Sequence, residues 1–119
     1  MNTALARLVT QASTQIEDFF KKDVQTAQKT SPQFVTDFER TIASIMEKDP
    51  KLGKKYKYNL DHYKMCVERC HWILRNFKDP TKCRLLFEEG RIDLKEEIEE
   101  IQSEWVTSTL RGVTSTLRV

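Results

Sequence analysis

Residues 59–77 read NLDHYKMCVERCHWILRNF, and this stretch decides the fold class. Its apolar side chains recur every three or four residues, which is the spacing of one face of an α-helix. We therefore expect a helix that begins at or slightly before Asn59 and packs along this face, although two heptads are too few to predict a coiled coil. The positions on the face are Leu60, Tyr63, Val67, Cys70, Leu74 and Phe77.

Similar apolar stripes precede this helix. Residues 3–28 carry one unbroken stripe and are predicted to form a single helix. Ser31 and Pro32 then resemble a helix start, because serine caps the first turn and proline fits the first helical position. A second helix is expected from there to Lys48, followed by a basic loop over residues 50–58.

The segment after residue 77 begins with the same kind of signal. Asp79 and Pro80 predict the start of another helix, as an N-cap followed by a proline in the first turn. Gly90 ends that helix in one interpretation, and Asp93 then caps a further helix that continues to about Arg111. In the other interpretation Gly90 lies inside one long helix, and the sequence does not decide between them.

The predicted fold is therefore an all-α, compact bundle of four to five mostly antiparallel helices with short loops. A chain of 119 residues and 14.0 kDa fits one domain, and we assign residues 1–111 to it. Residues 112–119 are expected to form a loosely ordered tail. With only 3 glycines and 3 prolines, a turn-rich β-sandwich is not expected.

The amino-acid composition argues against several classes of function. The chain has 20 basic and 18 acidic residues, which argues against a protein that coats nucleic acid or an anionic membrane. No stretch approaches the roughly 20 apolar residues of a membrane span. Three cysteines without a disulfide pattern predict a reducing compartment, cytoplasmic or nuclear. Mitochondrial import is the weaker alternative, since Arg7 is followed by no acidic residue before Glu17.

Motifs for catalysis are absent from the sequence. It contains no glycine-rich phosphate loop, no G-x-S-x-G turn and no H-E-x-x-H pair. We therefore expect neither an enzyme nor a cofactor.

A zinc site is the one metal alternative. His62, Cys66 and Cys70 lie four residues apart on one helical face, and Cys83 could add a fourth ligand from the next helix. The spacing differs from that of common zinc modules, and the outer two of the three stand about 12 Å apart by helical rise. Buried structural cysteines are the preferred interpretation.

Nucleic-acid binding is the main alternative function. Residues 50–91 hold 11 basic and 5 acidic side chains, whereas residues 92–119 hold 3 and 6. Lysines alternating with tyrosines can bind phosphates while the rings stack on bases. The candidate residues are Lys51, Lys54, Lys55, Tyr56, Lys57, Tyr58, Arg69 and Arg75.

Protein binding is the preferred function. The segment VTSTLR occurs at residues 106–111 and again at residues 113–118, and as a helix it forms an apolar stripe at coiled-coil spacing. A hairpin and an unstructured end are alternatives for this tail. We expect an interaction module, an adaptor or a complex subunit that could also self-associate. Its predicted partner-binding residues are Trp72, Trp105, Leu110, Val113, Leu117 and the C-terminal Val119.

Overall fold

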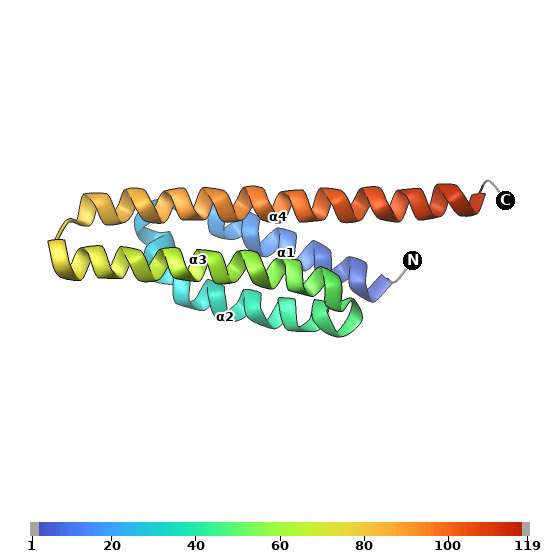
Figure 1. Cartoon of the computed structure of the whole chain (residues 1–119), viewed down its shortest axis with the longest axis horizontal. Coiled ribbons are helices and arrows are strands. Elements are labelled where there is room, and N and C mark those ends of the chain that lie inside the picture. The colour runs from blue at the N-terminus through green and yellow to red at the C-terminus, as the bar shows by residue number, and fades with distance from the viewer. Residues whose placement is uncertain (1–2, 118–119) are drawn as a thin grey trace.

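The computed structural model describes the backbone of residues 3–117 and the side chains of residues 3–110. Within these residues the chain forms four α-helices and no strand, which confirms the predicted all-α bundle. Helices α3 and α4 form an antiparallel hairpin that packs on the shorter pair α1 and α2 (Figure 1). The four helices are α1 (Thr3–Lys21), α2 (Val24–Lys48), α3 (Pro50–Phe77) and α4 (Pro80–Leu117).

The break between α1 and α2 lies at Asp23, and the prediction of a single helix over residues 3–28 is wrong. The Asp23 carboxylate accepts a hydrogen bond from the backbone N–H of Thr26 at 3.0 Å and so caps α2. Pro32 lies inside α2, and its ring is exposed. Periodicity missed this break because the apolar stripe continues across the chain reversal into the same core.

Helix α3 begins at Pro50, so the predicted basic loop over residues 50–58 is also wrong. Asp49 ends α2 and at the same time caps α3, because its carboxylate accepts from the N–H of Leu52 at 3.1 Å. Pro50 occupies the first helical position, where no N–H is needed. Gly53 is buried inside α3 and does not form a turn. Because it has no side chain, α3 can pack closely against α2 at this position.

The start of α4 at Pro80 agrees with the prediction. Lys78 ends α3 in a left-handed conformation, and the Asp79 carboxylate accepts from the N–H of Lys82 at 3.0 Å. From there α4 continues without interruption through Gly90 and Asp93 to Leu117. The residues that resembled a second helix start are thus interior positions of one long helix.

Aromatic rings fill the middle of the bundle. The rings of Phe19 and Phe34 stack with their centroids 4.0 Å apart, and Tyr63 meets both rings edge-on. The Tyr63 hydroxyl is 2.7 Å from the hydroxyl of Ser31, and both side chains are buried. Ser31, expected as an N-cap, instead provides this hydrogen-bond partner inside the core.

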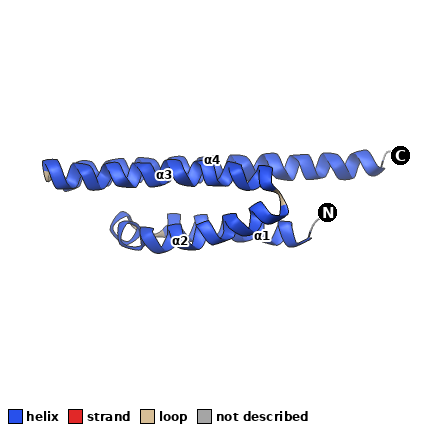
Figure 2. Cartoon of the chain, turned by 60° about the horizontal axis from the view of Figure 1, so that its bottom comes forward, coloured by secondary structure: helices blue, strands red, loops and turns tan. Residues whose placement is uncertain are grey.

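The molecule is elongated, with extents of 63 × 21 × 21 Å. The turn between α3 and α4 lies at one end, while the start of α1 and the end of α4 lie at the other (Figure 1). Figure 2 shows that the α3–α4 turn extends past α1 and α2 at one end, whereas α4 alone continues past the other helices at the opposite end. None of the helices, over the residues described, combines the length and apolar composition needed to cross a membrane.

Candidate functional site

The end of the molecule at the α3–α4 turn carries exposed apolar side chains. We call residues 69–85 the hairpin tip. Trp72 is 52% exposed, Phe77 65% and Leu85 68%. The rings of Trp72 and Phe77 touch edge to face, with centroids 5.4 Å apart. Trp72, predicted to bind a partner, is therefore accessible.

Two of the exposed side chains at the hairpin tip belong to the predicted core stripe. Leu60, Tyr63 and Cys70 are buried as expected, but Leu74 and Phe77 are exposed. The stripe has the correct period along its whole length, but α1 and α2 end before they reach its last turn (Figure 2). Periodicity predicts which side chains share a face and not whether a neighbouring helix covers that face.

Basic side chains accompany the apolar ones at the hairpin tip. Residues 69–85 contain five basic residues and one acidic residue, Asp79, which is the cap of α4. All five cations are exposed, and none forms an ion pair with an acidic side chain among residues 3–110. They are Arg69, Arg75, Lys78, Lys82 and Arg84.

The opposite end of α4 carries a second accessible apolar surface. Ile101 is the last buried side chain of this helix up to residue 110, and Trp105 is half-buried against the core. Beyond them Val106 is 47% exposed and Leu110 59%. We call residues 106–117 the α4 extension, because it continues past the bundle as a helix (Figure 1).

Several of the residues predicted for partner binding belong to α4 near its C-terminal end. Leu110 is exposed on the α4 extension, and Trp105 packs at its base. The side chains of Val113 and Leu117 lie outside the described residues, and so does the whole of Val119.

The three cysteines lie together between α3 and α4. Cys70 is buried and interacts with Cys66, one turn earlier, and with Cys83 on α4. Burial raises the pKa of the Cys70 thiol to about 12 and also raises the pKa of Cys66. A protonated buried thiol is a poor nucleophile, which is the behaviour of a structural cysteine.

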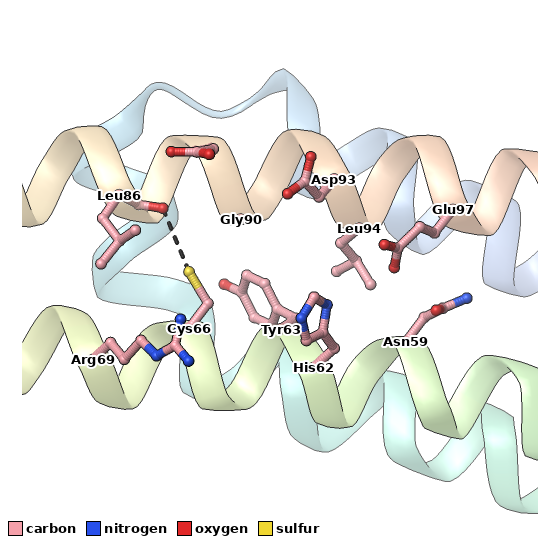
Figure 3. A pocket seen from close by; sticks show the side chains of 11 residues that line it. Asn59, His62, Tyr63, Cys66, Arg69, Leu86, Gly90, Asp93, Leu94 and Glu97 are labelled. Atoms are coloured by element: carbon pink, nitrogen blue, oxygen red, sulfur yellow. Dashed lines mark hydrogen bonds between the residues drawn. The ribbon is translucent and has the colours of Figure 1, made fainter.

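His62 does not join the cysteines as a ligand. No three histidine, cysteine, aspartate or glutamate side chains among the described residues are placed to hold one metal ion. The Cys66 thiol donates to the carbonyl oxygen of Leu86 at 3.4 Å, whereas His62 lies one turn earlier and faces Glu97 (Figure 3). The four predicted ligands therefore do not converge on one point among the described residues.

A polar pocket of about 130 Å³ lies on this seam (Figure 3). On the α3 side it is lined by His62 and Arg69, and on the α4 side by Asp93 and Glu97. Its volume is below the 300 Å³ or more that is typical of small-molecule sites. Opposite charges on the two walls favour the pairing of α3 with α4.

The basic segment at residues 51–57 is helical, and its side chains point in different directions. Tyr56 is fully buried and cannot stack on a base, whereas Tyr58 is exposed. Lys55 pairs with Glu104 at 3.7 Å, and Lys57 pairs with Asp61 at 3.1 Å. Lys51 and Lys54 are exposed. Arg69 and Arg75, also predicted to bind nucleic acid, lie at the hairpin tip instead.

Sequence reasoning missed the buried Arg91. Its guanidinium donates to the carbonyl oxygens of Phe19 at 3.0 Å and Lys22 at 2.9 Å, at the end of α1. It also forms two hydrogen bonds with the Glu88 carboxylate, at 2.9 and 2.7 Å. An arginine between Gly90 and Ile92 gives no periodic signal, and only its partner Glu88, three residues earlier, hints at a pair.

Compared with protein-family models, curated proteins and solved structures, the chain matches none. Function must therefore be inferred from the residues and their arrangement.

Proposed function

We propose that this chain is a non-catalytic protein–protein interaction module, an adaptor or a subunit of a larger assembly. It binds a helix of its partner along the α4 extension. The observation that carries the proposal is the exposure of Val106 and Leu110 on a helix that continues beyond Ile101, the last buried side chain of α4 up to residue 110.

The spacing of the exposed side chains supports a helical partner. Val106 and Leu110 are four residues apart on one face of α4, and in the sequence Val113 and Leu117 continue a four-three-four pattern. That pattern is the seam along which two helices pack side by side. Most helical stability in proteins comes from tertiary packing, so a partner helix packed along this stripe would stabilise the end of α4.

The buried thiol and the pocket on the α3–α4 seam give less support to a catalytic function than the α4 extension gives to partner binding. The buried thiol of Cys70 is held in its protonated form, and the pocket on the α3–α4 seam is small and bounded by opposite charges. The free thiols of Cys66, Cys70 and Cys83 fit a reducing compartment, cytoplasmic or nuclear. Nucleic-acid binding by residues 51–57 has less support, because Tyr56 is buried and Lys55 and Lys57 are paired.

A matched pair of variants tests the proposal. Leu110→Glu places a charge on the apolar face, whereas Ser108→Glu places the same charge about 160° away on the same helix. Both positions are exposed, so neither variant should disturb the bundle. The measurements are sedimentation of the pure chain and recovery of the complex that the tagged chain forms in its native host.

We expect wild type and Ser108→Glu to form the same complex. Leu110→Glu should bind the partner with an affinity that is lower by about tenfold or more. If the pure wild-type chain sediments as a dimer and Leu110→Glu as a monomer, the partner is a second copy of the chain. Equal complex formation by Leu110→Glu and Ser108→Glu would contradict the proposal.

A further inference from the structure

We infer that the hairpin tip binds an anionic phospholipid membrane surface, into which Trp72, Phe77 and Leu85 insert. This site lies at the opposite end of the molecule from the α4 extension and is independent of it (Figure 1). It is carried by the apolar side chains at the tip, by their arrangement and by the charge around them.

The arrangement of the exposed apolar side chains at the hairpin tip fits insertion into lipid better than contact with a flat protein surface. Trp72 and Leu74 are two residues apart on α3, so they point about 160° away from each other. Both are exposed, in the last turns of α3 before the hairpin turn. One flat protein surface cannot contact both sides of the hairpin, whereas lipid can surround it.

The residue types are those found where proteins meet a bilayer. Tryptophan is enriched at the level of the lipid headgroups, because its ring is apolar and its N–H is polar. Phe77 and Leu85, each about two-thirds exposed, supply purely apolar surface. Lys78 at the turn has a long aliphatic stem that can lie along apolar surface while its ammonium group reaches the headgroups.

Charge complementarity identifies the membrane as anionic. The five exposed cations of the hairpin tip make no ion pair with acidic side chains among residues 3–110. Arg69 lines the seam pocket opposite Asp93, and the other four remain available to a lipid phosphate or carboxylate. Lysine and arginine near an anionic leaflet contribute additively to binding within about 8 Å, the screening length at physiological salt. The balanced charge of the whole chain hides this local excess.

The acidic part of α4 fixes the orientation. Residues 96–104 contain five glutamates and no basic residue. Along α4 they lie about 18 to 30 Å from Arg84, which is beyond the screening length. An anionic surface therefore attracts the hairpin tip and repels the acidic stretch, so that the long axis stands away from the membrane.

The test uses the full chain with vesicles of phosphatidylcholine, either pure or with about 30 mol% phosphatidylserine. A tip variant combines Arg75→Glu, Lys78→Glu and Lys82→Glu. A matched control combines Lys48→Glu, Lys51→Glu and Lys54→Glu, which makes the same charge change at three exposed positions where α2 meets α3. Fluorescence quenching by brominated lipid reports insertion, with Trp72→Phe showing which tryptophan responds.

We expect binding that is about tenfold or more tighter to the anionic vesicles, with quenching that disappears in Trp72→Phe. The tip variant should lose about tenfold or more of this affinity, and the control variant should keep it. The inference is overturned by no preference for anionic vesicles, by equal losses in the two triple variants, or by binding without quenching of Trp72. Tight binding of a single-stranded oligonucleotide without vesicle binding would overturn it in favour of nucleic acid.

Discussion

Arg91 shows how a single side chain can connect two helices, α4 and α1, that are far apart in the sequence. It lies on α4, is 5% exposed, and satisfies two backbone carbonyls at the end of α1. Its guanidinium also lies 5.1 Å from the centre of the Phe20 ring, so its charge meets both a helix C-terminus and an aromatic face. Long-range contacts of this kind leave no periodic trace in a sequence.

Replacing Arg91 with methionine should destabilise the protein by about 3 kcal/mol, because it leaves the Glu88 carboxylate and two carbonyl groups without their partner. Methionine keeps an apolar stem of similar length, so the loss reports the charge and its hydrogen bonds. The measurement is urea unfolding followed by circular dichroism. Arg84→Met, at an exposed position, should change stability by less than about 0.5 kcal/mol. Equal stability of the two variants would refute the role assigned to Arg91.

Asp23 lies at the break between α1 and α2, which the periodic pattern did not predict. This residue also makes part of the stability of the protein depend on pH. The hydrogen bonds from Thr26 hold the pKa of Asp23 below its usual value of 3.8. Because this pKa is lower in the folded state, the Asp23 carboxylate stabilises the fold at pH values above 3.8. This stabilisation is lost as the pH falls through the pKa of the folded state. Asp23→Ala should therefore be less stable than wild type at neutral pH, and the difference should shrink in acid.

Urea unfolding from neutral pH to below 3.8 measures this effect. Asp23→Asn is the control, because asparagine caps a helix without titrating. A stability difference between wild type and Asp23→Ala that stays constant across this range would exclude the titration of Asp23 as its cause.

At the scale of elements, the sequence predicts the helices better than their ends. The apolar stripes identified helical segments throughout the chain, and the Asp79–Pro80 start agreed with the structure. Pro32 was predicted at the first position of a helix and residues 50–58 as a loop, whereas Pro32 lies inside α2 and Gly53 inside α3. Which role each one takes depends on packing, and a local motif does not contain that information.

Gly53 marks the closest approach of α2 and α3. A methyl group at this position would stand 2.7 Å from the Cα of Met46, which is backbone and cannot turn aside. At Gly90 the methyl would meet the Cys66 sulfur at 2.5 Å, and a thiol can rotate away by giving up its hydrogen bond to Leu86.

Gly53→Ala should therefore destabilise the protein by about 2 kcal/mol, although alanine favours helix formation by about 1 kcal/mol over glycine. Gly90→Ala should cost clearly less, since helix propensity offsets most of the lost contact. Thermal and urea unfolding of both variants decide the order. Similar losses at the two positions would show that Cys66 cannot make room.

At the scale of the whole molecule, the site was less predictable than the fold. The residues that we propose for binding were predicted from their types, and among them Trp72 and Leu110 are accessible. Phe77 and Leu74 were assigned to the core, since a sequence does not reveal that α1 and α2 are shorter than the hairpin they support. Relative helix length thus decides which apolar side chains pack inside and which remain outside.

The central claim is that the apolar side chains at the two ends of the α3–α4 hairpin serve binding and not folding. The most direct measurement is the free energy of unfolding of a variant that combines Phe77→Gln, Leu85→Gln and Leu110→Gln. These side chains are 65%, 68% and 59% exposed, and glutamine keeps the helix propensity high. We expect the triple variant to lie within about 1 kcal/mol of wild type, whereas Ile98→Ala in the core should cost about 2–5 kcal/mol. A loss in the triple variant as large as that of Ile98→Ala would contradict the claim.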